Sequence, residues 1–198
     1  WSADTAKHEV RERRSWELAR LSFETRQLSP EASVMRLEDQ VNTLRDGADA
    51  YPSALADGLS YLAHLEEAVE NHESANQHFL EARQLFESSG DGSSLARAWV
   101  VAGVGRTAEQ LGQLESAVEA YREGIAGLEF HLGSWHKTLV PLYLGLGRLG
   151  RRMSDLEAAE AALHQADNIV RELGESLPIP LRSDVLRELA ALYSEQKR

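Results

Sequence analysis

The amino-acid sequence repeats itself with a period of 42 residues, and this period restricts the fold more than any other feature. Val-Gly-Arg at 104–106 recurs as Leu-Gly-Arg at 146–148 and as Leu-Ala-His at 62–64. The same shift relates three further sets of positions: Ala75, Ala117 and Ala159; Phe79, Tyr121 and Leu163; and Ala82, Gly124 and Ala166. Small and large positions that stay in register over three copies indicate an internal repeat, in which each repeat packs on its neighbours.

The spacing of these positions predicts helices. Within one copy they lie three and four residues apart, as in Ala75, Phe79 and Ala82, and this is the period of an α-helix. We therefore expect an all-α fold, a right-handed α-solenoid of antiparallel helix pairs with about nine helices, in a single domain over residues 1–198. Its predicted parts are a divergent first repeat at 8–47, repeats at 52–90, 94–132 and 136–174, and a terminal helix at 183–196.

Local signals predict how individual helices begin. Ser29 followed by Pro30 predicts a capped helix start, and Ser154 with Glu157 has the Ser-x-x-Glu pattern of a capping box. The prolines of Leu-Pro-Ile-Pro at 177–180 predict an extended connector before the terminal helix. The recurring small residues predict that two helices cross closely at those positions, because a large side chain would not fit there.

The third repeat carries the anchor positions of a known family. In chain order they are Val104, Gly105, Gly112, Leu114, Ala117, Tyr121 and Gly124. This pattern resembles the tetratricopeptide repeat, and the second and fourth repeats match it at fewer positions. The period of 42 residues resembles the long-helix variety typified by kinesin light chains. The resemblance implies first helices that line a concave groove, with the residue after each small anchor pointing into that groove.

Composition excludes several classes of function. The net charge of −11 argues against nucleic-acid binding, which needs clustered Lys and Arg. The chain has no cysteine, so neither disulfides nor thiolate metal sites are expected. No apolar run approaches the roughly 20 residues that span a bilayer, so no membrane insertion is expected. The start lacks both a Met and an apolar signal core, from which we expect a fragment or a processed chain and, by default, a soluble cytoplasmic protein.

No pattern of residues predicts catalysis, a cofactor or a metal. The Gly-x-Gly-x-x-Gly series at 145–150 has the spacing of a dinucleotide-binding loop, but its first two glycines lie 42 residues after Gly103 and Gly105. We therefore interpret them as packing positions of the repeat. No two histidines have the i, i+4 spacing of a zinc pair on one helix face. The glutamates at 66, 67, 70 and 73 are expected to form a solvated acidic face.

The residues most informative about function follow the small anchors of the first helices. Together with residues one turn away and on the rim, they define the predicted partner-binding groove: Arg20, Ser60, His64, Glu67, Arg106, Glu109, Arg148, Arg151, Arg152 and Arg187. A line of arginines predicts an acidic or carboxylate-bearing ligand, because a guanidinium forms two parallel hydrogen bonds with a carboxylate. The alternative is that Arg106 and Arg148 pair with Glu109 and neighbouring acids on a solvated surface.

Three functional hypotheses follow. The first is a protein–protein interaction module, part of a larger protein, that binds a peptide or helix of a partner in its concave groove. The alternative is a structural spacer or a self-association domain without a groove ligand, with self-association through the apolar-rich terminal helix at 185–193. The third is an enzyme that uses the glycines at 145–150 as a nucleotide loop, which would require a nucleotide to raise the melting temperature.

Overall fold

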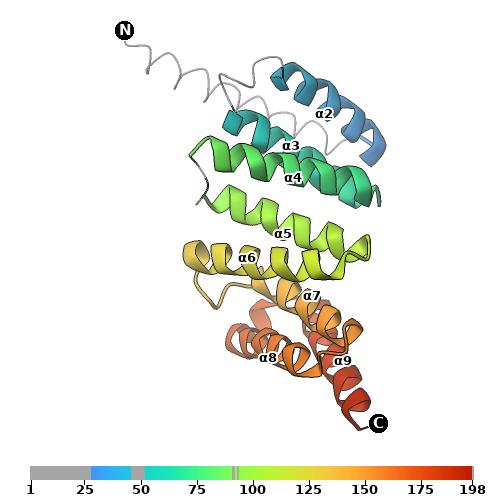
Figure 1. Ribbon diagram of the computed structural model, residues 1–198. Coiled ribbons are helices and arrows are strands. Elements are labelled where there is room, and N and C mark those ends of the chain that lie inside the picture. The colour runs from blue at the N-terminus through green and yellow to red at the C-terminus, as the bar shows by residue number, and fades with distance from the viewer. Residues whose placement is uncertain (1–27, 46–51, 91, 93, 198) are drawn as a thin grey trace. The chain divides into compact units, whose positions relative to one another are not determined.

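The computed structural model describes residues 28–45, 52–90, 92 and 94–197. These residues form eight α-helices and a short 3-10 helix and contain no β-strand, which confirms the expected all-α class (Figure 1). The elements are α2 (Pro30–Arg45), α3 (Pro52–Ala68), α4 (His72–Ser88), α5 (Leu95–Gln110), α6 (Leu114–Leu132), α7 (Leu139–Arg152), α8 (Leu156–Leu173), η1 (Gly174–Ser176) and α9 (Ile179–Gln196). The helix expected within 8–26, with Arg20, lies outside the described residues.

The chain divides into two compact units, unit 1 at 1–100 and unit 2 at 101–198. In unit 1, α3 packs against both α2 and α4. The core between these helices contains Leu37, Leu59, Leu62 and Phe79, each at most 1% exposed. Ser29 begins α2 as expected, because its hydroxyl oxygen accepts a hydrogen bond from the Ala32 amide at 3.2 Å.

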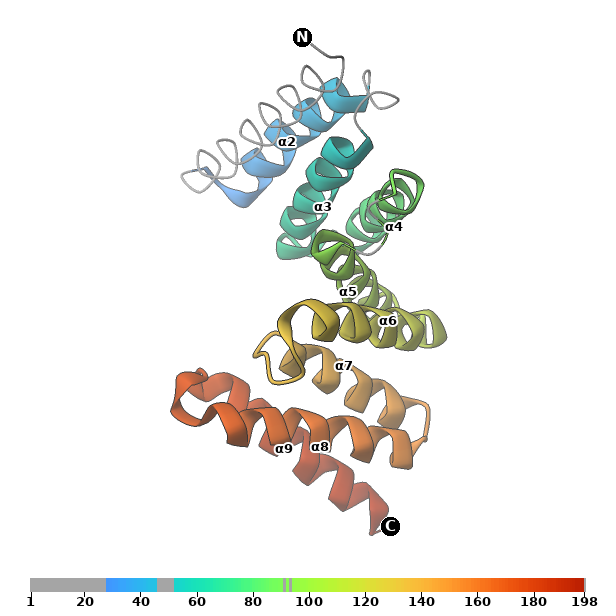
Figure 2. The ribbon, with the colours of Figure 1, turned by 90° about the vertical axis from the view of Figure 1, so that its left-hand side faces the viewer.

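In unit 2, α7 is the central helix, since it packs against α6, α8 and α9 (Figure 2). Helix α8 also packs against α9. The core holds Tyr121, Leu128, Leu149 and Leu163, each at most 1% exposed. Helix α7 therefore has neighbours on several sides, and its side chains on different faces reach different helices.

The small anchors of unit 2 mark close approaches, as the sequence predicted. A Cβ added to Gly105 would lie 2.8 Å from the ring of Tyr121, and one added to Gly145 would lie 2.6 Å from the same ring. The ring is therefore held between a glycine of α5 and a glycine of α7. A Cβ at Gly150 would lie 2.8 Å from the backbone nitrogen of Ala159. At this point the backbones of α7 and α8 are in contact, so no larger residue fits.

The turns between paired helices share one backbone conformation. Glu70, Gly112 and Ser154 have positive φ angles of 62°, 74° and 61°, and these positions are 42 residues apart. The amide that follows each of them bonds to a carbonyl five residues earlier, as Asp155 N does to Gly150 O at 2.8 Å. This is a Schellman turn, whose left-handed position usually holds glycine. Glycine stands there in only one of the three turns.

The turn geometry corrects the prediction that Ser154 caps α8. Ser154 occupies the left-handed position of the turn, and Asp155 is the N-cap, with its carboxylate accepting from the Ala158 amide at 3.0 Å. The Schellman turn requires a left-handed residue before the cap, which moves the cap one residue along the chain. Asn71 caps α4 in the same way, through the Ser74 amide at 3.4 Å.

The predicted extended connector at 177–180 is also wrong in its last two residues, which are helical. Helix α9 begins at Ile179, four residues before the expected start at 183. Pro180 lies in its first turn, where a missing N–H costs no hydrogen bond and the fixed φ of proline suits the helix. Pro178 remains extended and precedes the helix.

Replacing the non-glycine residues of the Schellman turns by glycine should stabilise the protein. The left-handed conformation costs a non-glycine residue about 1–2 kcal/mol, and the greater freedom of glycine in the unfolded chain offsets part of this gain. We expect Ser154→Gly to raise the free energy of unfolding by about 0.5–1 kcal/mol, measured by urea denaturation. Ser154→Ala, which keeps the strain, is the control and should give no gain. A destabilised Ser154→Gly would contradict the assignment.

Candidate functional site

Three predicted groove arginines lie on one face of α7. Arg148, Arg151 and Arg152 have the i, i+3, i+4 spacing that places side chains together on a helix. From this face, Arg148 and Arg152 reach α5, and Arg151 reaches α9. The three arginines thus share a face of α7, and their hydrogen bonds show which groups they meet.

Arg148 forms a two-bonded ion pair with Glu109 of α5. Its Nε donates to Glu109 Oε1 at 2.8 Å, and its Nη2 donates to Glu109 Oε2 at 2.9 Å. The Tyr121 hydroxyl donates to the same Oε2 at 2.7 Å. Glu109 is only 6% exposed, so this carboxylate is a buried charge with hydrogen-bonded partners. Arg148 therefore pairs with Glu109, as the alternative to a ligand-binding role predicted. Glu109 is buried, however, and is not part of a solvated surface.

The network changes the acidity of its members. Burial raises the pKa of the Tyr121 hydroxyl, and the negative charge of Glu109 raises it further, while the positive charges of Arg148 and Arg106 lower it. The net pKa of Tyr121 lies well above its usual range. Burial lowers the pKa of Arg148, but its hydrogen bonds and its attraction to Glu109 outweigh this effect and raise it overall. Tyr121 is therefore neutral and Arg148 charged at physiological pH.

Arg151 is held by two carboxylates of α9. Its Nη1 donates to Glu188 Oε2 at 2.5 Å, and its Nη2 donates to Glu195 Oε1 at 2.7 Å. A third bond joins its Nε to Glu195 Oε2 at 3.1 Å. The hydrogen bond to Glu195 is the main reason that the pKa of Arg151 is raised. Neither Glu188 nor Glu195 is among the site residues predicted from the sequence.

A signal for these acids exists in the repeat register. Glu109 lies 42 residues before Arg151, so the same position changes from an acid on α5 to a base on α7. Glu195 lies 44 residues after Arg151, close to the corresponding position on α9. Charges of opposite sign at equivalent positions of neighbouring helices indicate ion pairs between those helices. Comparing equivalent positions of the repeats would therefore have predicted Glu195 as a partner of Arg151.

Arg152 is the least neutralised of the three. It is exposed, and its Nη1 donates to the main-chain oxygen of Glu109 at a long 3.4 Å. No carboxylate among the described residues forms an ion pair with it. Next to it lies a hollow of about 310 Å³, lined by Arg148, Arg151, Arg152, Glu188 and Glu195. Arg187 is also exposed and pairs with Asp184 of its own helix at 2.7 Å.

Three of the predicted groove residues lie in unit 1. Ser60, His64 and Glu67 lie along α3, and His64 Nδ1 is 3.6 Å from a Glu67 carboxylate oxygen. The His64 ring packs edge-on against Phe79, with the ring centres 4.9 Å apart. His64 therefore contacts both Glu67 and the core of its own unit, and α3 contains no arginine.

The expectation of a solvated acidic face over 66–73 is wrong for Glu66. This residue is 1% exposed, and its Oε2 lies 2.7 Å from His78 Nδ1. The later repeats have Ala108 and Gly150 at the position of Glu66, 42 and 84 residues on. A charged side chain thus occupies a small position of the repeat, with a histidine from the paired helix as its partner.

The glycine series at 145–150 lies inside α7. Gly145 faces the Tyr121 ring, Gly147 faces Leu163, and Gly150 faces the backbone of Ala159. A dinucleotide loop needs glycines at a turn between a strand and a helix, and these glycines are instead the contact points of packed helices. The nucleotide-loop hypothesis therefore has no support in this part of the chain.

Two structural features are absent from the part of the chain that the structure describes. No cluster of three or more His, Cys, Asp or Glu side chains with metal-binding geometry occurs among the described residues. None of the described helices has the length and hydropathy needed to cross a membrane.

The stability of the protein should fall above pH 10 because of Tyr121. Its pKa is raised in the folded state, so the stabilisation is present below the unfolded value of about 10 and is lost as the pH rises and the unfolded chain ionises. Ionisation of Tyr121 in the unfolded chain should lower the free energy of unfolding by about 1.4 kcal/mol between pH 9 and pH 11. We expect Tyr121→Phe to show a loss smaller by that amount in urea unfolding at the two pH values. An equal loss in both proteins would contradict the shifted pKa.

Comparison with known proteins agrees with this geometry. Residues 54–129 match the tetratricopeptide repeat family. A variant of a Podosopora anserina protein with nearly identical TPR-like repeats of the kinesin light chain type aligns with a TM-score of 0.74 at 18% identity, over 93% of this chain and 87% of that one. BtubC (BKLC) from P. vanneervenii aligns with a TM-score of 0.67 at 20% identity, over 98% and 84%. No curated protein sequence matches the chain significantly. Residues 54–129 therefore match the tetratricopeptide repeat family, and the fold of the chain is similar to the α-solenoid of these TPR-like repeat proteins.

Proposed function

We propose that this protein is a protein–protein interaction module that binds an acidic or carboxylate-bearing peptide segment of a partner on the arginine face of α7. Repeat solenoids commonly present extended surfaces to partners, which supports the general role. The observation that carries the more specific proposal is the state of Arg152. It is an exposed cation beside a hollow, and no carboxylate of the described chain pairs with it.

The neighbouring ion pairs make this face suitable for a carboxylate. Arg148 is fixed by Glu109, and Arg151 is fixed by Glu188 and Glu195. These arginines therefore stay in place when a ligand binds, and little conformational entropy is lost. A peptide carboxylate beside Arg152 would form an ion pair with the one arginine of α7 that has no carboxylate partner among the described residues. The planar guanidinium can bind it with two hydrogen bonds.

The same geometry decides which arginine should be changed in a test. Replacing Arg148 by Glu would place a second carboxylate against the buried Glu109 and leave that charge without its partner, which costs about 3–5 kcal/mol in buried pairs. Loss of binding would then reflect unfolding. Arg152 avoids this problem because it is exposed and holds only a weak main-chain contact.

Selection of peptides from a phage-displayed random library tests the proposal. We expect the wild-type chain to select peptides that contain Asp, Glu or a free C-terminus, and Arg152→Glu to bind a class of these peptides at least about tenfold more weakly, since a charge-assisted hydrogen bond contributes about 1.5–3 kcal/mol. Lys137→Glu makes the same charge change at an exposed position that precedes α7 and lines neither this hollow nor another pocket of unit 2, and it is the matched control. A selection in which no carboxylate peptide binds Arg152→Glu more weakly than wild type would contradict the proposal.

A second candidate function, self-association, is favoured by one observation. On α9, Ile179, Leu186 and Tyr193 are exposed by 69%, 62% and 39%, and they are spaced by seven residues. Apolar residues at that spacing form a continuous stripe on one helix face, as in a coiled-coil seam. Two copies could bury this stripe against each other, which is the self-association hypothesis for the terminal helix.

Light scattering during size-exclusion chromatography distinguishes the two functions. Self-association through α9 predicts a wild-type mass of two chains at high micromolar concentration and a mass of one chain for Leu186→Lys. The substitution should leave the folded state intact, because the Leu186 side chain is mostly in solvent. A wild-type protein that remains a single chain would exclude this hypothesis and leave the groove proposal unaffected.

A further inference from the structure

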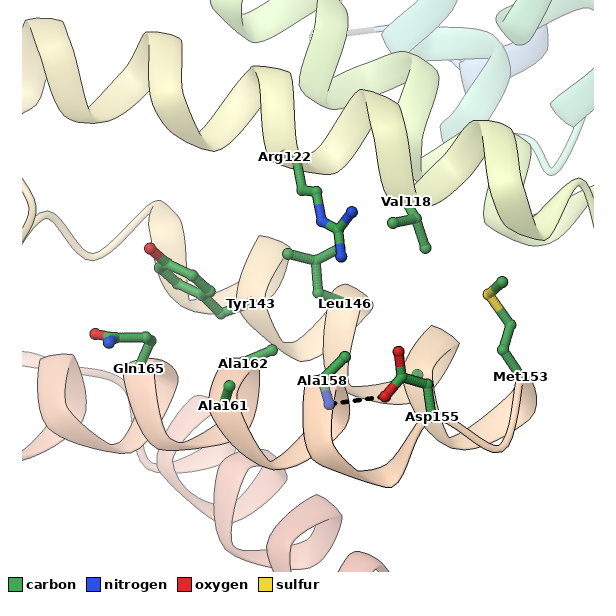
Figure 3. Close-up of a pocket in the computed structure, with 11 residues that line it drawn as sticks. Val118, Arg122, Tyr143, Leu146, Met153, Asp155, Ala158, Ala161, Ala162 and Gln165 are labelled. Atoms are coloured by element: carbon green, nitrogen blue, oxygen red, sulfur yellow. Dashed lines mark hydrogen bonds between the residues drawn. The ribbon is translucent and has the colours of Figure 1, made fainter.

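A second pocket of unit 2 lies between α6, α7 and α8 and has a volume of about 470 Å³ (Figure 3). Leu146 of α7 and Val118 of α6 supply apolar walls, and Ala158 and Ala162 of α8 form the side below them. Met153 stands at one end and is 40% exposed. The pocket is therefore an apolar hollow at the protein surface, with a flexible thioether side chain at its edge.

This pocket is separate from the arginine face of α7. Leu146, Gly150 and Met153 line it from α7 with the i, i+4, i+7 spacing of one helix face. Arg148 lies two residues from both Leu146 and Gly150, and two residues turn an α-helix by about 200°. The pocket and the arginines thus occupy opposite sides of the same helix, and a ligand in one does not touch the other.

Two of the pocket's lining positions hold larger side chains in the second repeat. Gly150 and Ala162 line the pocket, and 84 residues earlier the chain has Glu66 and His78 at these positions. In the second repeat, the carboxylate and the imidazole at these positions lie 2.7 Å apart. In the fourth repeat, the same positions have no side chain larger than a methyl group, and both line the hollow.

One polar feature gives the pocket its chemical preference. Arg122 of α6 lines the pocket and extends toward Leu146 (Figure 3). It is exposed, and it forms neither an ion pair nor a hydrogen bond with the residues that the structure describes. The carboxylate of Asp155, at the other side, is bound to the Ala158 amide at 3.0 Å as the cap of α8. The pocket therefore presents an unneutralised cation beside an apolar surface.

We propose that this pocket is a second docking site, which takes one apolar side chain from an acidic segment of a partner protein while a neighbouring carboxylate of that segment pairs with Arg122. Arg122, Met153, Ala161 and Gln165 are all exposed at its edge. Sites for free small molecules bury most of the ligand surface, and this open edge suits an anchoring side chain on a longer chain. Met153 can adapt its shape to different anchors, since methionine is unbranched and polarizable.

Two variants test the site, each with a matched control. Ala161→Phe adds a ring at the exposed edge of the pocket, and Ala126→Phe adds the same ring at an exposed position of α6 that does not line it. Arg122→Glu reverses the charge in the pocket, and Arg152→Glu makes the same reversal on the opposite side of α7. The probes are individual peptides selected by the wild-type chain from the phage-displayed random library, and octanoate as a free amphiphilic carboxylate. Affinities are measured by isothermal titration calorimetry.

The proposal expects a class of selected peptides with an apolar residue next to Asp or Glu. Both Ala161→Phe and Arg122→Glu should weaken these peptides at least about tenfold, a change of about 1.4 kcal/mol, while Ala126→Phe and Arg152→Glu leave them unchanged. If Arg152→Glu is the only substitution that weakens the selected peptides, the second docking site is overturned and the arginine face of α7 is supported. If Arg122→Glu weakens the binding of octanoate but of no selected peptide, the second docking site is overturned in favour of a small-molecule site.

Discussion

The buried contact of Tyr121 with Glu109 and Arg148 is the interaction on which unit 2 depends. The tyrosine ring fits between Gly105 and Gly145, and its hydroxyl and the Arg148 guanidinium hold the same carboxylate. A buried carboxylate is stable only when its hydrogen-bonding capacity is met, so each partner has to be in place. One set of contacts thereby joins α5, α6 and α7, and it combines close packing with a specific arrangement of charge.

This arrangement gives α7 two faces with different chemistry. On one side, Arg148 and Arg151 bind acids of α5 and α9, which leaves Arg152 as the cation available to a partner. On the other side, Gly150 approaches α8 so closely that backbones touch, and an apolar pocket remains beside Arg122. A repeat built from paired helices exposes its first and second helices on opposite sides, so one helix can take part in two independent interactions.

The repeats agree in backbone geometry while they differ in side chains. The turns at Glu70, Gly112 and Ser154 have the same left-handed residue, although only one of them is a glycine. The packing of the helices on either side therefore outweighs the local cost of the turn. The same tolerance appears in Glu66 and His78, where an acid and an imidazole together occupy positions that hold small residues elsewhere. Variation of this kind can alter surfaces and pockets without changing the fold.

The sequence by itself determined the helical repeat, its period and the close packing at small residues, because these depend on a pattern that recurs in register, as at Gly105 and Gly147. It also placed the α7 arginines on one face, since helical spacing decides that. Tertiary structure alone decided which charges meet: Glu188 and Glu195 reach Arg151 from α9, and Glu66 is buried against His78. These partners lie far apart in the chain, and ion pairing depends on distances of a few ångströms between side chains, which periodicity does not specify. The pocket beside Arg122 arises for the same reason, because a hollow is the space left between three packed helices.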